Sequence, residues 1–152
     1  MKKLISLALI FVSLLALISC AGEKSVTLDI DAVAKKLASL PYVEKLEPLD
    51  PSVVTTLYTF TSGAEKVVAY GASGATPEEL IVAEYSDEAA ADTAMAKFEA
   101  RVASQKETFD SYNAEYRPLL DDYLLRRVGK YIVYCVSDDA KAASAALEEF
   151  LG

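Results

Sequence analysis

The chain has 152 residues, 53% of them hydrophobic and 25% charged, with 23 acidic residues against 15 basic ones and no histidine. A net charge of −8 disfavours nucleic acid as a partner, because phosphate groups are repelled by an acidic surface. The lack of histidine excludes a histidine-based catalytic triad and an imidazole metal ligand. The sequence also has no P-loop and no GxGxxG motif, so we expect no cofactor and no metal.

The first twenty residues have the pattern of an export signal. Lys2 and Lys3 precede an apolar run from Leu4 to Leu17, and "LISC" follows, ending at Cys20. A basic start followed by an apolar run is typical of a secretory signal, and a stretch of about 16 residues is shorter than the about 20 that cross a bilayer. The "LISC" stretch resembles a bacterial lipobox, which implies that the Cys20 thiol carries diacylglycerol and that residues 1–19 are a lipoprotein signal peptide. The alternative is an ordinary secretory signal that contains a cysteine.

Lipidation would anchor the protein to the cell membrane on its extracytoplasmic face, without a spanning helix. Loss of residues 1–19 removes two lysines and no acid, which leaves 13 basic and 23 acidic residues and a charge of −10. Residues 20–27 then form the lipidated cysteine and a short linker, which at about 3.3 Å per residue reaches roughly 20 to 25 Å. The expected partners are the membrane, through the anchor, and an envelope protein or a small ligand close to it.

Residues 28–152 are predicted to form a single α+β domain. Apolar residues at helical spacing predict a helix over 30–40 that ends at Pro41. A second short helix is expected after Asp50, which can cap it, with Pro51 at its first position and Gly63 beyond its end. Residues 66–72 read as a strand.

Two local patterns then disagree at "TPEELIVAEYS". Thr76, Pro77 and Glu79 have the spacing of a capping box, whereas the apolar residues that follow indicate a strand. We interpret the segment as one helical turn over 77–80 that leads into a strand over 80–86, followed by a long helix over 87–107.

The pattern of the C-terminal third predicts a β-hairpin followed by a helix. Gly129 and Lys130 separate two extended runs, and the last helix is expected to begin at Asp138. Asp87 and Asp138 are both predicted to be helix N-caps. Taken in chain order, the predicted elements are two N-terminal helices and then ββα-ββα. This order predicts an α+β fold with a four-stranded, mostly antiparallel sheet and helices packed on one face.

An internal similarity accompanies this order. "IVAEYSDEAAADTA" from Ile81 and "IVYCVSDDAKAASA" from Ile132 agree at seven of 14 positions. Either an ancient duplication or two similar strand-to-helix junctions with alanine-rich helices would produce this agreement. Cys135 alternates with Val133 and Tyr131, and with no histidine to activate it we expect a buried, inert thiol.

Three stretches resemble a known family. They are "SGATPEELIVAEYSD" from Ser73, a row with Arg101, Gln105, Phe109 and Tyr112 at spacings of 4, 4 and 3, and "VGKYIVYCVSDD" near the end. Together they resemble a family of small Gram-positive lipoproteins, known only as a domain of unknown function. The resemblance implies a lipobox, a short linker and one domain of this size, and it implies no catalytic residues.

No catalytic residue is therefore assigned. The acidic pairs Asp29/Asp31, Asp87/Glu88, Asp121/Asp122 and Asp138/Asp139 are explained by caps and solvated faces. Tyrosine is common at binding faces and equally common in half-buried contacts. The candidate binding residues are Tyr112, Tyr116, Tyr131, Arg101 and Gln105.

These observations favour a non-catalytic binding or interaction module at the cell envelope. The alternative is an envelope hydrolase that uses carboxylate or tyrosine side chains. A deep pocket with convergent acidic side chains would favour the hydrolase, whereas a shallow tyrosine-lined patch or an uncovered strand edge would favour the binding module.

Overall fold

The computed structural model describes residues 26–152, so the predicted signal peptide and Cys20 lie outside the described residues. The four α-helices of this part are α2 (Ile30–Ala38), α3 (Pro51–Leu57), α4 (Glu88–Tyr112) and α5 (Ala140–Glu148). The five strands are β1 (Glu47–Pro48), β2 (Lys66–Gly71), β3 (Glu79–Glu84), β4 (Leu124–Val128) and β5 (Tyr131–Val136). Two short 3-10 helices are η1 (Thr59–Thr61) and η2 (Arg117–Leu120).

The fold is α+β with a single antiparallel sheet in the order β1-β2-β3-β5-β4. The predicted number of four strands is wrong, because β1 adds a fifth by pairing Glu47 and Pro48 with Gly71 and Tyr70. A two-residue strand is too short to show an alternating pattern, so it could not be recognised from the sequence. The central strands β3 and β5 pair over six residues each.

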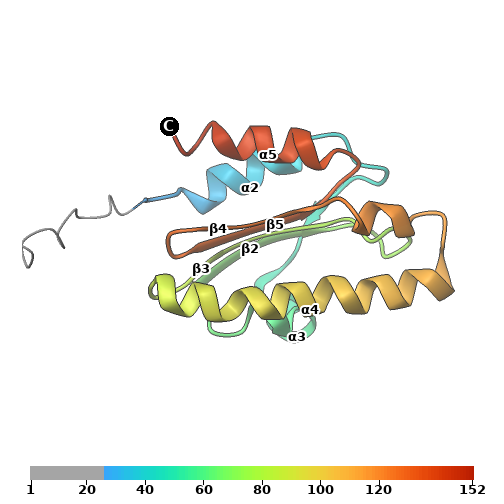
Figure 1. The fold of residues 1–152 in the computed structure, drawn as a ribbon, viewed down its shortest axis with the longest axis horizontal. Coiled ribbons are helices and arrows are strands. Elements are labelled where there is room, and N and C mark those ends of the chain that lie inside the picture. Colours follow the sequence, from blue (N-terminus) through green and yellow to red (C-terminus); the bar gives the residue numbers. More distant parts are fainter. Residues whose placement is uncertain (1–25) are drawn as a thin grey trace, which may run out of the picture.

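Helices cover both faces of the sheet, so the prediction that they pack on one face is wrong. Figure 1 shows α2 and α5 on one side and α3 and α4 on the other. The reason lies in β3 and β5, in which successive side chains point to opposite faces and nearly all are apolar. Leu80 and Val82 pack with α2 and α5, while Ile81 and Ala83 pack with α3 and α4.

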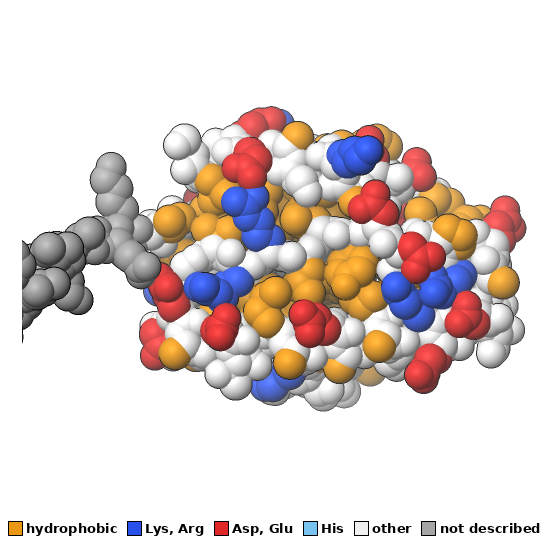
Figure 2. All heavy atoms as spheres, viewed as in Figure 1, with side chains coloured by type: hydrophobic (Ala, Val, Ile, Leu, Met, Phe, Trp, Pro, Cys, Tyr) orange, Lys and Arg blue, Asp and Glu red, His pale blue; other side chains and the backbone are white. Residues whose placement is uncertain are grey.

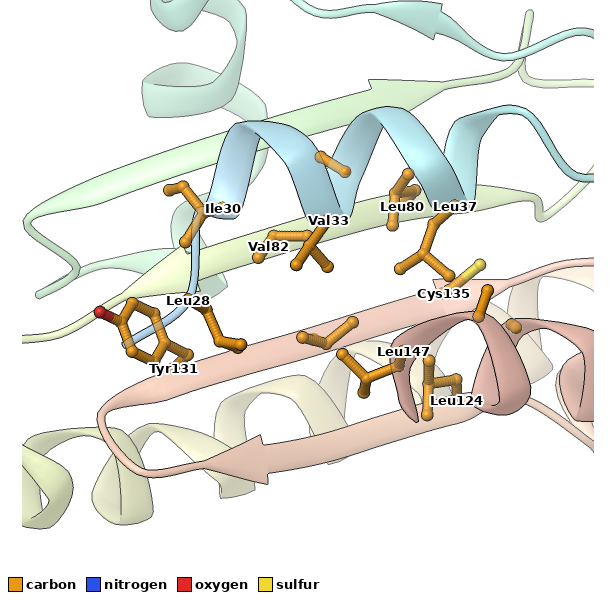
Figure 3. Packing of buried hydrophobic residues seen from close by; sticks show 14 of the residues in the cluster. Leu28, Ile30, Val33, Leu37, Leu80, Val82, Leu124, Tyr131, Cys135 and Leu147 are labelled. Atoms are coloured by element: carbon orange, nitrogen blue, oxygen red, sulfur yellow. The ribbon is translucent and has the colours of Figure 1, made fainter. Parts of the chain in front are cut away.

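The core beneath α2 and α5 is drawn in Figure 3. Val33 and Leu37 of α2 point toward Leu80 and Val82 of β3, and Leu147 of α5 lies over β4 and β5. Val33, Leu37 and Leu147 have no exposed surface. Because α4 belongs to the other layer, the two similar ββα segments place their helices on opposite faces.

Helix α4 is longer than the strands that it covers, and this length positions the candidate site. Its 25 residues extend over about 37 Å, whereas the six residues of β3 extend over about 20 Å. A stripe on α4 faces the sheet and comprises Ala91, Ala94, Phe98, Val102, Gln105 and Phe109. The last turns of α4 therefore pass beyond the start of β3 and lie against the loop that joins β2 to β3.

The surface seen in Figure 2 intermingles acidic and basic side chains with apolar ones between them. Most charged contacts are exposed pairs such as Lys36 with Glu149 and Lys45 with Glu47. Exposed pairs of this kind contribute little to stability, so the stability of the domain rests on its two apolar layers.

Asp50 caps α3 as predicted, whereas of the two caps predicted for the later helices, at Asp87 and Asp138, only one is correct. The Asp87 side chain accepts a hydrogen bond from the backbone N–H of Ala90 at 2.7 Å, as an N-cap does. Asp138 is not a cap. Asp139 caps α5 instead, accepting from the N–H of Ala142 at 2.9 Å. The similarity to the Asp87 segment predicted the cap one residue too early.

The cap of α5 gives a prediction with a built-in control. Replacing Asp139 with alanine should lower the free energy of unfolding by about 1 kcal/mol, because one helix N–H loses its acceptor. Asp139→Asn should recover most of this loss, and Asp138→Ala should change stability little. Urea unfolding of the three variants measures the difference. A larger loss for Asp138→Ala than for Asp139→Ala would contradict the assignment.

Cys135 is fully buried beside Val133 and Tyr131 in the layer under α2 and α5, as the alternation predicted. Its Sγ lies 3.3 Å from the Tyr42 hydroxyl, which donates a hydrogen bond to the carbonyl oxygen of Leu37. Burial raises the pKa of the Cys135 thiol to about 11. The thiolate is the reactive form, so the folded protein holds this thiol in its inert form at neutral pH.

We expect native Cys135 to resist alkylation until the chain is unfolded, which a thiol-labelling time course with and without urea measures. Because the folded state keeps the proton to about pH 11 and the unfolded state releases it near about 8.5, stability should fall as pH rises through this window. Cys135→Ala should lower the free energy of unfolding by on the order of 1 kcal/mol, because burial of the side chain is lost. The stability of this variant should fall less than that of the native protein as pH rises. Rapid labelling of the native protein would contradict the buried assignment.

Candidate binding cleft

A cleft of about 330 Å³ opens where α4 passes beyond the sheet. We name it the Arg101 cleft. It is lined by Tyr58, Ala72, Gly74, Thr76, Pro77, Glu78, Glu79, Arg101, Gln105, Thr108, Phe109 and Tyr112. These residues come from the end of α3, the loop between β2 and β3, the first residue of β3 and the last three turns of α4.

A buried ion pair forms one wall of the cleft. Arg101 donates from Nε and Nη2 to the two oxygens of Glu79, at 3.0 and 2.9 Å. The hydroxyl of Tyr134 donates to Glu79 Oε1 at 3.0 Å. The Glu79 side chain is only 3% exposed and that of Arg101 is 31% exposed. A bidentate pair of this kind is geometrically specific, so it fixes the guanidinium at the edge of the cleft.

Aromatic rings hold the same guanidinium. Arg101 Cζ lies 5.6 Å from the centre of the Tyr58 ring and 5.5 Å from that of Phe60, within the range of cation–π contacts. Burial alone would lower the pKa of Arg101, but the hydrogen bonds and charge of Glu79 raise it overall. Burial, together with the Glu79 charge, raises the pKa of Tyr58 and Tyr134. Both phenols therefore stay neutral at physiological pH.

A second buried carboxylate holds the loop that leads into β3. Glu78 is 2% exposed and accepts from the backbone N–H groups of Val43 and Glu44 at 2.8 and 2.9 Å. The Thr76 hydroxyl also donates to Glu78. Glu44 in turn accepts from the backbone N–H and hydroxyl of Ser73. These bonds tie the loop between β2 and β3 to the segment after α2.

The capping-box interpretation of this segment is wrong. Thr76 and Glu79 do not open a helical turn, because β3 begins at Glu79 itself. The Thr76 hydroxyl bonds Glu78 and not a helix N–H. Within this segment, the only local sign of the site was a pair of adjacent glutamates at the start of an apolar strand. Their partners Arg101 and Val43 lie 22 and 35 residues away, so spacing alone could not reveal them.

The structure brings three of the predicted binding residues together. Arg101, Gln105 and Tyr112 all line the cleft, as their spacing on one side of a helix allows. Tyr116 does not line it, and packs half-buried beside η2 against the layer under α3 and α4. Tyr131 is 2% exposed and lies in the opposite layer. Sequence reasoning missed Glu79, Tyr58 and Thr76.

The cleft offers unused hydrogen-bonding groups. Within residues 26–152, Arg101 Nη1 makes no hydrogen bond to protein, because Glu79 occupies only the Nε and Nη2 edge. Gln105 also lines the cleft and is largely buried, with 9% of the residue exposed. Its side-chain amide nevertheless has no hydrogen-bond partner in the protein among these residues. A guanidinium presents five N–H donors, so an acceptor from a ligand can bind its outer edge.

Across residues 26–152, the acidic and cysteine side chains form no group of three that could hold a metal ion. No helix of this described part is long and apolar enough to span a membrane.

The fold and the site together define a three-layer α+β domain with a polar cleft at one end of its sheet. Residues 43–137, more than half of the chain, match the family Domain of unknown function (DUF4358), and the chain belongs to this family. The matched region contains the whole cleft, whereas α2 and α5 lie outside it. Searches of curated proteins and of solved structures gave no match.

Proposed function

We propose that the protein is a lipid-anchored extracytoplasmic module that binds a ligand in the Arg101 cleft without chemical change. The observation that carries this proposal is the outer edge of Arg101, which is fixed by Glu79 and two aromatic rings yet has no protein acceptor among the described residues. Fixed donors at the wall of a cleft are the usual means of orienting a bound ligand.

The bonding of the two carboxylates favours binding over hydrolysis. A general acid or base must reach the proton that it transfers. Both oxygens of Glu79 accept from Arg101, with Tyr134 as a further donor. Those of Glu78 accept from two backbone N–H groups and from Thr76. Each carboxylate is thus engaged by protein donors, which leaves the hydrolase alternative without a free carboxylate at this site.

The position of the cleft suits an anchored protein. Val26 lies beside Gly129 in the turn between β4 and β5, and this turn is at the Glu84 end of β3, where Glu84 pairs with Tyr131. The cleft begins at Glu79, the other end of the same strand. An anchor at Cys20 would join the domain at the first end, about 20 Å along the strand from the cleft.

The anchor is tested by Cys20→Ala. Without its thiol the chain cannot accept diacylglycerol, so we expect the variant to keep its precursor mass and to lose radiolabelled fatty acid. Mass spectrometry measures the mass, and autoradiography of the membrane and soluble fractions measures the label. Cys135→Ala serves as the matched control and should retain the label. Unchanged labelling and cleavage in Cys20→Ala would contradict the lipid anchor.

A further inference from the structure

We infer that the ligand of the Arg101 cleft is an uncharged peptide segment, held through a backbone amide by Arg101 and Gln105. This inference rests on the proposed function and adds the chemical class of the ligand. It follows from the charge of the cleft, from the balance of its donors and acceptors, and from the apolar side chains around it.

The charge of the lining disfavours an anion. Arg101 is its one basic residue, against the two acids Glu78 and Glu79, so its formal charge is −1. Arg101 is already neutralised by the bidentate contact with Glu79. The chain as a whole also carries a charge of −8. A carboxylate or phosphate would add negative charge to this site, whereas a neutral acceptor gains the Arg101 donors without repulsion.

The free polar groups match an amide. The outer edge of Arg101 supplies only donors, and Gln105 supplies one amide oxygen and one NH₂ group. A backbone amide has one carbonyl acceptor and one N–H donor, which these groups satisfy together. Sugar hydroxyls would need several acceptors, because each donates as well as accepts. The carboxylate oxygens of the cleft are already bound to protein donors.

An exposed aromatic ring at the cleft suits a side chain of a peptide. Tyr112 lines the cleft and is 67% exposed, and its ring meets that of Phe109 edge to face. Leu57, next to the lining residue Tyr58, is also 67% exposed, and Val43, bonded to Glu78, is 47% exposed. These are three of the four large exposed hydrophobic residues within 26–152. Of these three, Tyr112 lines the cleft itself, and an exposed aromatic side chain is typical of an interaction site.

The test uses ¹H–¹⁵N spectra of the mature lipidated chain in nanodiscs. The probe is N-acetyl-L-phenylalanine N-methylamide, which is uncharged and carries two amides and one aromatic ring. Acetate, phosphate and methyl glucoside are the comparison compounds. We expect the amide probe to shift the Gln105 side-chain and Arg101 Nε–H signals in a saturable way, and the others to leave them unchanged at equal concentration.

Gln105→Leu should weaken probe binding by about fivefold, the equivalent of one lost hydrogen bond, while Ser104→Ala, on the exposed side of the same turn, should not. Tighter binding of acetate, phosphate or methyl glucoside than of the amide probe, at the same two signals, would overturn the ligand class and leave the proposed function standing. If none of the four compounds shifts these signals, both the ligand class and the binding role of the cleft are wrong.

Discussion

Replacing Glu79 with alanine is expected to destabilise the domain by about 3 kcal/mol or more. The change removes both acceptors of Arg101 and the acceptor of the Tyr134 hydroxyl. The Glu79 side chain is 3% exposed, so the groups that it accepts from are left with few alternative partners. The Arg101 side chain is 31% exposed, so in the variant its guanidinium can turn partly into solvent. The loss of stability is therefore expected at the lower end of the range for a broken buried ion pair. Chemical unfolding of the purified domain measures it.

A double variant distinguishes the cost of breaking the Glu79–Arg101 ion pair from the cost of removing both of its charges. Glu79→Leu combined with Arg101→Met removes both charges, and replacing a buried pair with apolar residues costs much less than breaking it. The double variant should therefore be more stable than Glu79→Leu alone. Lys36→Met, which breaks an exposed pair with Glu149, should cost at most about 1 kcal/mol. A Glu79→Ala cost no greater than that of Lys36→Met would contradict the buried ion pair.

The second large effect is expected at Phe98, where alanine should cost about 3 to 5 kcal/mol. Phe98 has no exposed surface and contacts two aromatic rings edge to face. Its ring centre lies 5.1 Å from that of Phe60 and 5.8 Å from that of Tyr134. The alanine variant loses this burial and leaves a cavity between α4 and the sheet. Thermal and urea unfolding should both report the loss.

Met95 provides the control for Phe98, since it is on the same helix but only partly buried. Met95→Ala should cost clearly less than Phe98→Ala. Because Phe60 also touches the Arg101 guanidinium, Phe98→Ala should in addition shift the Arg101 Nε–H signal, and Met95→Ala should not. Equal costs for the two variants would contradict the central place of Phe98 in this layer.

The helices and the long strands follow from patterns that are local in the sequence. Asp29 caps α2, and the apolar spacing after it places the helix within two residues of its observed end. The turn was recognisable because Gly129 and Lys130 separate two extended runs, and the positive φ of 54° at Gly129 suits glycine in a two-residue hairpin. The distribution of helices over two faces was not foreseen, because the side chains of β3 and β5 are apolar on both faces, apart from the two terminal glutamates of β3, and do not indicate which face each helix covers.

Only the part of the candidate site on α4 could be predicted from the sequence. Arg101, Gln105 and Tyr112 share one side of α4, so a helical spacing sufficed to group them. Glu79 was assigned to a capping box because its local neighbours Thr76 and Pro77 fit one. Its actual role depends on Arg101 and Tyr134, which tertiary contacts bring to it. A buried charge cannot be paired with its partner from local pattern alone.

The central claim, an extracytoplasmic module with a ligand in the Arg101 cleft, is tested most directly by thiol labelling in intact cells. Tyr112→Cys places a thiol at the cleft, and Lys141→Cys places one at an exposed site on α5. The native Cys135 is buried and should stay silent. The reagent is a maleimide that does not cross the cytoplasmic membrane.

We predict that both variants are labelled in intact cells. We also predict that the Tyr112→Cys rate, relative to Lys141→Cys, is several-fold lower in cells than in the purified protein, because the native ligand covers the cleft. Labelling of neither variant until the cells are lysed would contradict the extracytoplasmic location. Equal relative rates in cells and in the purified protein would contradict a ligand in the cleft.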